Sequence, residues 1–288
     1  MKRNTIKTIG HQKSEGSKIS MLTAYDFSTA KLMDEAGVEI LLVGDSLGNT
    51  MLGYRDTLPV TMEDMIRASA AVSRGADNAL IVADMPFMSY QSSVYDAVVN
   101  AGRLIKEGFA EAVKLEGGVS FTEHIRAITD ASIPVMAHIG LTPQSVNAFG
   151  GFKVQGKDEE TAMKIVDDAL AVEKAGAFAV VLECVPSELA AMVTKMLEIP
   201  TIGIGAGAGT DGQVLVYHDM LGLYGRKSPK FSKRFADVGA LMKRGVFDYI
   251  AEVKTGTFPA AEHCFCIDGA LMEKLRRYAE MKGDQEEE

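Results

Sequence analysis

The chain has 288 residues, of which 47% are hydrophobic, and its formal net charge is −9. This length can bury one barrel-sized core or two smaller ones. The acidic charge argues against a nucleic acid or an anionic membrane as partner. Three cysteines give no disulfide framework, so we expect reduced thiols. The polar N-terminus and the lack of an apolar run of roughly 20 residues predict a soluble, cytoplasmic protein.

Strand and helix signals alternate along the chain. Short, β-rich apolar runs between turn signals predict buried parallel strands. They occupy residues 19–23, 40–43, 79–83, 112–115, 134–138, 179–182, 200–204 and 214–216. Helical signals lie between them at residues 28–36, 61–73, 94–107 and 122–130, then from about 160 to 174 and at 186–197.

Seven or eight strand–helix units in roughly 220 residues are typical of a closed α/β barrel, the (β/α)₈ or TIM barrel, more than of an open sheet. From about Ser232 onward the sequence predicts further helices as a C-terminal extension, and the charged end at 283–288 is expected to be flexible. No linker or composition shift marks a boundary, so we interpret residues 1–288 as one barrel domain with this extension.

Each of four predicted strands is followed closely by a carboxylate. These carboxylates are Asp45, Asp84, Glu116 and Glu183. Residues at the C-terminal ends of barrel strands converge on one mouth. Carboxylates gathered there repel one another and are costly to desolvate unless a cation or a proton neutralises them. The pattern predicts a site for a hard divalent ion, Mg²⁺ above Zn²⁺, with one carboxylate left for proton transfer. The alternative is that each acid merely caps a following helix.

Two basic side chains are expected to face the same mouth. Lys114 lies two residues before Glu116 and therefore points to the same side of its strand. It could bind the carboxylate of a small acid or form a Schiff base, and the predicted metal favours the first role. His138 ends the fifth predicted strand and is either a site residue or a core histidine. His218, beside the eighth strand, stays unassigned.

Three other motifs carry weaker signals. Residues 203–208 match the dinucleotide fingerprint, but no helix follows directly, which favours a tight turn beside the mouth. The glycine-rich loop at 140–160 is either a lid or a solvated connection. Cys264 and Cys266 form a C-x-C motif without a second pair, which argues against a zinc site.

Several stretches, taken together and in chain order, match the pattern of a known family. They are residues 42–48, 57–61, 83–88, 113–118, 138–147, 182–186 and 202–207. These stretches, with Leu-Val-Gly-Asp-Ser-Leu-Gly first among them, closely resemble the ketopantoate hydroxymethyltransferase family over roughly residues 4 to 265. Arg55, Asp56 and Cys264 depart from the family pattern, and the tail beyond Cys266 has no counterpart.

The resemblance implies a (β/α)₈ barrel that needs Mg²⁺ and uses 5,10-methylenetetrahydrofolate as one-carbon donor. A hydroxymethyl group would pass to 3-methyl-2-oxobutanoate through a Mg-stabilised enolate, giving 2-dehydropantoate in pantothenate and coenzyme A biosynthesis. The family's metal carboxylates fall on Asp45, Asp84 and Glu116 and its catalytic base on Glu183. Its substrate contacts fall on Asp45, Ser46, Asp84 and Lys114, to which we add His138.

Two rival functions remain open at the level of sequence. A metal-dependent carbon–carbon lyase in a related barrel would carry a Lys-Cys-Gly-His loop, which this chain lacks. A non-catalytic binder would need no base, so an intact Glu183 counts against it.

Assembly is the last expectation from the sequence. Apolar residues fall at near-helical spacing in residues 238–250 and 270–281, which requires either the barrel's own helices or another copy as partner face. The resemblance implies a homo-oligomer, commonly a decamer of two stacked pentamers.

Overall fold

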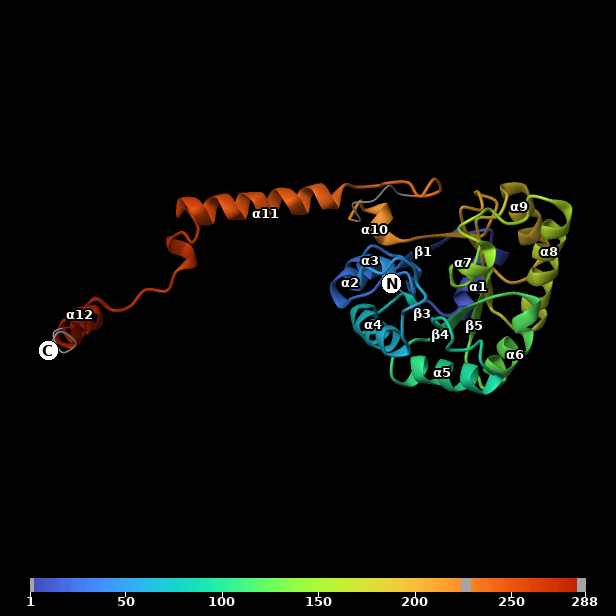
Figure 1. The fold of residues 1–288 in the computed structure, drawn as a ribbon, viewed down its shortest axis with the longest axis horizontal. Helices are drawn as coiled ribbons and strands as arrows, with labels where there is room; N and C mark the ends of the chain where they lie inside the picture. Colours follow the sequence, from blue (N-terminus) through green and yellow to red (C-terminus); the bar gives the residue numbers. More distant parts are fainter. Residues whose placement is uncertain (1–2, 224–228, 284–288) are drawn as a thin grey trace. The chain divides into compact units, whose positions relative to one another are not determined.

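The computed structural model describes residues 3–223 and 229–283 (Figure 1). The chain divides into two compact units, Met1–Asp237 and Val238–Glu288. Most of the charged end that we expected to be flexible, residues 284–288, lies outside the described residues. The expected organisation as one barrel domain with a helical extension stays a prediction.

The first unit is a closed barrel of eight parallel strands in sequence order, with β8 paired to β1. The strands are β1 Ile19–Thr23, β2 Ile40–Val43, β3 Leu80–Asp84, β4 Ala112–Glu116, β5 Val135–Gly140, β6 Ala179–Glu183, β7 Thr201–Ile204 and β8 Gly212–Leu215. This topology confirms the predicted TIM barrel. The eighth strand starts earlier than expected, at Gly212, because residues 212–213 pair with both β1 and β7.

Helices surround the strands as a ring in Figure 1. In chain order the described helices of this unit are α1 Ile6–Ser14, α2 Phe27–Glu35, α3 Leu47–Thr50, α4 Met62–Gly75, α5 Val94–Lys106, α6 Thr122–Asp130, α7 Val146–Phe149, α8 Glu159–Lys174, α9 Ser187–Met196 and α10 Tyr217–Met220. Local chemistry sets the starts of the long ones. Thr61 caps α4 in a reciprocal box with Asp64, and Asp158 caps α8 with Thr161.

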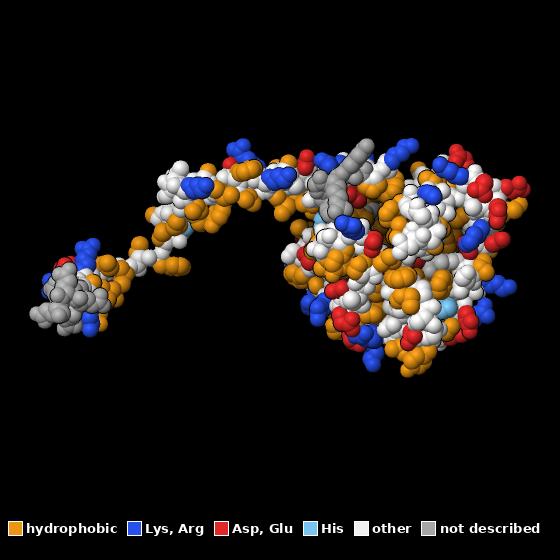
Figure 2. Space-filling view, viewed as in Figure 1, with side chains coloured by type: hydrophobic (Ala, Val, Ile, Leu, Met, Phe, Trp, Pro, Cys, Tyr) orange, Lys and Arg blue, Asp and Glu red, His pale blue; other side chains and the backbone are white. Residues whose placement is uncertain are grey.

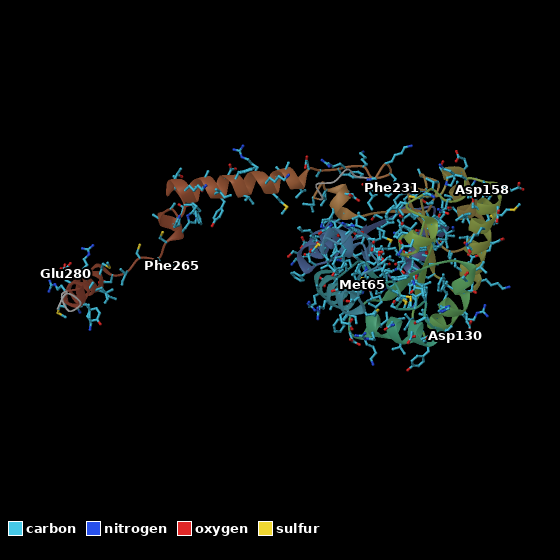
Figure 3. All side chains as sticks on the ribbon, in the orientation of Figure 1. Met65, Asp130, Asp158, Phe231, Phe265 and Glu280 are labelled. Carbon is cyan, nitrogen blue, oxygen red and sulfur yellow. The ribbon has the colours of Figure 1, made fainter. Side chains whose placement is uncertain are left out.

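Apolar side chains form two layers, one inside the barrel and one between strands and helices. Met21, Leu42, Val82 and Met136 point inward, whereas their neighbours along each strand pack under the helices. Met65 of α4, labelled in Figure 3, belongs to the outer layer and is fully buried. Both faces of β2, β3, β4 and β7 are buried along their whole length, whereas β1 and β8 expose Ser20 and Gln213.

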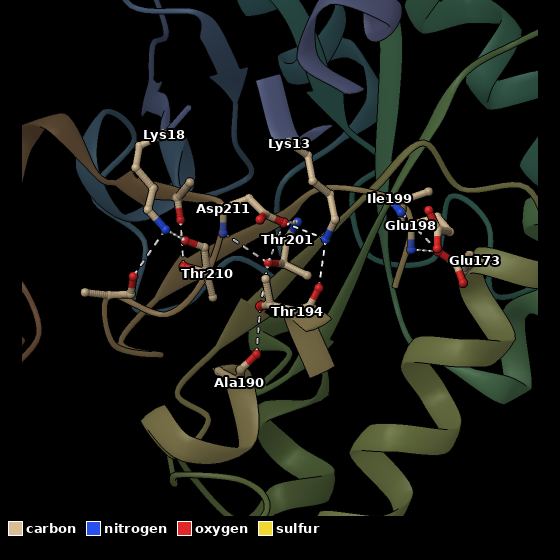
Figure 4. A network of polar contacts seen from close by, with 12 residues as sticks. Lys13, Lys18, Glu173, Ala190, Thr194, Glu198, Ile199, Thr201, Thr210 and Asp211 are labelled. Atoms are coloured by element: carbon tan, nitrogen blue, oxygen red, sulfur yellow. Dashed lines mark hydrogen bonds and ion pairs between the residues drawn. The ribbon is translucent and has the colours of Figure 1, made fainter. Parts of the chain in front are cut away.

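Helix α1 was not predicted, because its sequence is polar and buries only Ile9. Ile9 packs into the inner layer of the barrel core. Lys13 Nζ donates to Asp211 Oδ2 at 2.9 Å and to the Thr194 carbonyl at 2.8 Å (Figure 4). The same Asp211 oxygen accepts the Thr201 N–H at 2.8 Å. These contacts join α1 to the loop before β8 and, through Asp211, to β7. They lie at the N-terminal end of the strands, so ligands must enter the barrel from the other end.

The second unit contains α11 Val238–Thr255 and α12 Gly269–Gly283, which confirms that the tail is helical. Hydrophobic side chains run along α11 in Figure 2, and Leu241 and Phe247 are about two thirds exposed. Phe265, between the helices, projects fully into solvent (Figure 3). Cys264 and Cys266 are free and exposed thiols. None of the helices in the described ranges is long and apolar enough to cross a membrane.

A buried carboxylate fixes the turn before β3. Asp34 of α2 accepts hydrogen bonds from the N–H groups of Asp77, Asn78 and Ala79 and from the Asn78 amide, at 2.7–3.2 Å. Burial would raise the pKa of Asp34, but these hydrogen bonds outweigh it and lower the pKa from its usual 3.8. The stabilisation is therefore complete above pH 3.8 and is lost as the pH falls through the folded-state pKa.

We expect Asp34→Ala to lower the free energy of unfolding by about 3 kcal/mol at pH 7, because it leaves buried N–H groups unpaired. The difference from wild type should shrink once the pH falls below 3.8. Urea unfolding across this range measures both quantities. Asp130→Ala, at an exposed helix end, serves as the control and should change little. An Asp34→Ala effect that does not vary with pH would contradict the assignment.

Candidate active site

A cavity of about 150 Å³ opens at the C-terminal ends of the barrel strands. All seven site residues that the sequence predicted line it: Asp45, Ser46, Asp84, Lys114, Glu116, His138 and Glu183. Its remaining wall is largely apolar and comes mainly from β2, β6, β7, β8 and later loops: Thr23, Leu42, Pro143, Val181, Ile204, Val214, Val216, Asp219, Pro229 and Phe231. The rule that the C-terminal ends of barrel strands converge therefore predicted where the cavity lies.

Strand register brings the polar residues together. Asp84 pairs with Lys114 across β3 and β4, and Glu116 pairs with His138 across β4 and β5. Asp84, Glu116 and Glu183 are the last residues of their strands, whereas Asp45 lies two residues beyond β2. The helices that follow these strands have other N-cap residues, namely Ser46, Ser93, Phe121 and Pro186. The alternative reading of the acids as helix caps is therefore wrong.

Lys114 forms a buried ion pair with Asp84. Its Nζ lies 2.8 Å from Asp84 Oδ1, and both residues are at most 4% exposed. Burial would lower the pKa of Lys114, but the charges of Asp84, Glu116 and Asp45 outweigh it and raise that pKa. A Schiff-base lysine must be a neutral amine. The charged ammonium therefore favours the ion-binding role.

His138 connects Lys114 to Glu183. Its Nδ1 lies 3.2 Å from Lys114 Nζ, and its Nε2 lies 3.2 Å from Glu183 Oε2. Burial and Lys114 oppose a charged ring, but Glu116 and Glu183 raise the pKa of His138 to about 9. The ring is therefore held between Lys114 and two carboxyl groups, and its Nε2 faces Glu183 at ion-pair distance.

The surroundings of Asp45 disfavour its charged form. Its N–H donates to Asp84 Oδ2 at 3.0 Å, so the two carboxyl groups are held close. Burial, and then the charges of Asp84 and Glu116, raise the pKa of Asp45 to about 8. With Glu183 included, four carboxyl groups share the cavity with two basic side chains. Such an excess of negative charge is typical of a cation-binding or catalytic site.

Sequence reasoning missed two residues that organise these acids. Gln144 is buried, and its Nε2 donates to Asp45 Oδ2 at 2.9 Å. Tyr90 is also buried, and its hydroxyl lies 3.0 Å from Gln144 Oε1 and 3.1 Å from the Glu116 nitrogen. Gln144 falls in the stretch 138–147 that carries the family resemblance, but nothing in the sequence assigned it a role. Nothing local marked Tyr90.

Ser46 is held by a second tyrosine. The Tyr25 hydroxyl lies 2.8 Å from Ser46 Oγ, and burial raises the pKa of Tyr25. The unassigned His218 does not line the cavity. It is buried against the rings of Tyr25 and Tyr217, with centroids 5.6 and 4.0 Å away. Burial lowers the pKa of His218 to about 4, so it is neutral at pH 7.

The backbone around Glu183 has little freedom. Gly140 pairs with it, at φ +91°, and a Cβ there would lie 2.4 Å from the Glu183 carbonyl oxygen. Cys184 adopts the left-handed region at φ +49°, which a residue with a side chain rarely does outside functional sites. Residues 205–211 form a turn between β7 and β8, as predicted, and no helix follows directly.

A family model described as ketopantoate hydroxymethyltransferase matches residues 3–261. Among curated relatives, the 3-methyl-2-oxobutanoate hydroxymethyltransferase of Clostridium novyi (strain NT) is 67% identical over 95% of this chain and 99% of the relative. The enzyme of the same name from Enterococcus faecalis (strain ATCC 700802 / V583) is 63% identical over the same shares.

Solved structures resemble the chain in fold alone. Phosphoenolpyruvate phosphomutase from Streptomyces platensis subsp. rosaceus has a TM-score of 0.60 at 14% identity, covering 99% of each chain. A 2,3-dimethylmalate lyase, described as a member of the PEP mutase/isocitrate lyase superfamily, has a TM-score of 0.57 at 15% identity over 98% of this chain and 99% of its own. These structures therefore share the barrel fold with this chain.

Proposed function

The chain belongs to the ketopantoate hydroxymethyltransferase family, and we propose that it performs the full reaction that the sequence resemblance implied. In that reaction a hydroxymethyl group passes from 5,10-methylenetetrahydrofolate to 3-methyl-2-oxobutanoate and gives 2-dehydropantoate, a step of pantothenate biosynthesis in the cytoplasm. Its relatives' name supports a transferase that forms ketopantoate. The observation that carries the proposal is the cavity in which Glu183 stands beside three buried carboxyl groups.

The carboxyl groups suit Mg²⁺ in their chemistry. All are oxygen donors, and the raised pKa of Asp45 shows how strongly the site disfavours its uncompensated charge. The described residues contain no ready-made cluster of three or more metal-binding side chains. Mg²⁺ usually takes one or two protein carboxylates and completes its shell with water and substrate oxygens, so such a site would need those oxygens as well. We assign Asp45 and Asp84 as direct ligands and Glu116 as close by or bridged through water.

We assign substrate binding to Lys114 and Ser46. An ammonium group has three N–H donors, and Lys114 directs two of them to Asp84 and His138. The third remains for the carboxylate of a 2-oxo acid. Bound Mg²⁺ would act as a Lewis acid towards the keto oxygen and favour loss of the adjacent C–H proton.

Glu183 is placed to take that proton. His138 Nε2 lies 3.2 Å from Oε2, and no described residue donates a hydrogen bond to Oε1. Once C3 has lost its proton, it forms a bond to the methylene carbon as the first of that carbon's two bonds to folate nitrogens breaks. The second carbon–nitrogen bond breaks when the carbon–oxygen bond forms. Water supplies the hydroxyl oxygen, and the folate nitrogens regain hydrogen, so the net reaction balances.

Proton exchange tests this proposal without the folate. The protein is mixed with 3-methyl-2-oxobutanoate and Mg²⁺ in D₂O, and the C3 proton is followed by NMR. Exchange supports an enolising enzyme over a non-catalytic binder. A protein that binds both ligands yet leaves the C3 proton unexchanged would refute it. Ketopantoate formation on adding the folate then separates the transferase from a lyase.

Glu183→Gln keeps the size of the side chain and removes its basicity. We expect exchange at C3 to fall by at least about 100-fold, the usual contribution of a general base, while substrate and metal still bind. Glu188→Gln, on the exposed first turn of α9, is the matched control and should exchange normally. Exchange near the wild-type rate in Glu183→Gln would assign the base to another group, with His138 as the next candidate.

Asp84→Asn removes one charge from the proposed metal site. Mg²⁺ affinity, measured by calorimetry, should fall and most activity should be lost, because an amide is a weaker ligand for a hard ion. Asp130→Asn provides the same substitution on an exposed helix end. Equal Mg²⁺ affinities for Asp84→Asn and wild type would remove Asp84 from the ligand set.

We also propose a homodecamer. The support is the resemblance together with the apolar side of α11, which includes Leu241, Met242, Val246 and Ile250 and requires either the barrel's own helices or another copy as partner face. Light scattering on the full chain should give a mass well above the single-chain 30.9 kDa at micromolar concentration. A monomeric mass would refute the proposal. A decamer that survives deletion of the residues after Gly256 would refute only the role of the tail.

A further inference from the structure

We infer that Gln144 is a positioning residue that holds Asp45 and Glu116 in place for a divalent cation. The inference rests on the proposed metal site and adds to it a residue that touches neither the cation nor the substrate. Its basis is a buried set of hydrogen bonds that joins two carboxyl groups from strands that are not neighbours in the barrel, since β3 lies between β2 and β4.

Gln144 donates to both acids. Its backbone N–H donates to Glu116 Oε2 at 2.9 Å, and its side-chain Nε2 donates to Asp45 Oδ2 at 2.9 Å. The same Nε2 donates to the Met85 carbonyl at 2.9 Å, just after β3. One residue therefore fixes one oxygen of each acid relative to the end of the strand between them.

The orientation of the amide is determined by its surroundings. Gln144 Oε1 accepts hydrogen bonds from the Tyr90 hydroxyl and from Gln91 Nε2, both at 3.0 Å. Donors therefore surround the oxygen end, and the acceptors Asp45 and Met85 surround the nitrogen end. A rotated amide would place its oxygen against the Met85 carbonyl and its N–H groups against Gln91 Nε2, so the observed orientation, with Nε2 toward Asp45, is favoured.

Tyr90 supports the same arrangement from the other side. Its hydroxyl accepts the Glu116 N–H at 3.1 Å and can donate either to the Glu116 carbonyl or to Gln144, each at 3.0 Å. The ring is 1% exposed and packs edge-on against Phe121 at a centroid distance of 5.3 Å. The hydroxyl is consequently a fixed point for both the Glu116 backbone and the Gln144 side chain.

A neutral donor suits this task better than a cation would. Asp84 is already neutralised by Lys114, so a second ammonium beside Asp45 would remove the charge that attracts a metal ion. Gln144 restrains Asp45 without cancelling its charge. Hydrogen-bond partners of metal ligands typically account for 10- to 100-fold in metal affinity.

Calorimetry with Mg²⁺ on the full-length protein tests the role. Gln144→Met keeps the length of the side chain and removes its hydrogen bonds, so the Kd for Mg²⁺ should rise by about 10-fold or more. Gln213→Met is the matched control, because the Gln213 amide also donates two hydrogen bonds. Gln213 lies near the N-terminal end of β8, away from the acids. The control should bind Mg²⁺ like wild type.

A second readout separates positioning from a general structural role. At saturating Mg²⁺, C3 exchange by Gln144→Met should return to within a few-fold of wild type, because every group that contacts substrate remains. A variant whose low exchange rate does not respond to Mg²⁺ would overturn the inference. So would a Kd for Mg²⁺ within twofold of wild type.

Tyr90→Phe keeps the test decisive if Gln144→Met does not fold. It removes one hydroxyl and should weaken Mg²⁺ binding in the same direction by a smaller factor, again with recovery at high Mg²⁺. Unchanged Mg²⁺ affinity in Tyr90→Phe would then overturn the inference. Failure of the proposed function itself is distinguishable, because it would appear in the wild-type protein as a lack of C3 exchange or of Mg²⁺ binding.

Discussion

An excess of buried carboxyl groups over basic groups is the constraint on which the active end of this barrel depends. Asp45, Asp84 and Glu116 are each at most 4% exposed, and Lys114 with His138 supplies the nearby positive charge. Packing such groups together costs free energy unless each oxygen has a donor or a cation. Rigid strand ends, buried donors and a closed opposite end of the barrel make this arrangement tolerable.

The part of this arrangement that follows from local sequence could be predicted. An apolar run that ends in an acid is visible without any tertiary information, and the rule that strand ends converge then places Asp84, Glu116 and Glu183 in one cavity. Lys114 followed from the two-residue period of a strand. The barrel is confirmed, and the family resemblance is confirmed by the relatives. The roles assigned to these residues remain predictions.

What could not be predicted depends on contacts between distant positions. Gln144 and Asp45 are 99 residues apart, and Lys13 of the unpredicted helix α1 contacts Asp211 across 198 residues. Neither pairing leaves a periodic signal, because a single polar residue in a loop or on an amphipathic helix is ordinary. The neutral donors Gln144 and Tyr90 were therefore missed, although the acids, Lys114 and His138 were found. Fold likeness adds no chemistry here, since phosphomutases and lyases share the barrel.

The raised pKa of Asp45 connects the stability of the barrel to its proposed cation. An acid whose pKa moves from 3.8 to about 8 on folding keeps a proton that the unfolded chain has already lost. Its contribution to stability therefore becomes increasingly unfavourable as the pH rises from 3.8 to about 8, and the full cost applies above that window. A cation that binds only the folded barrel offsets this cost by mass action. The charge of Asp45 that destabilises the folded state is thus also the source of the site's preference for a metal ion. Gln144 can restrain the Asp45 carboxylate only because it leaves that charge in place.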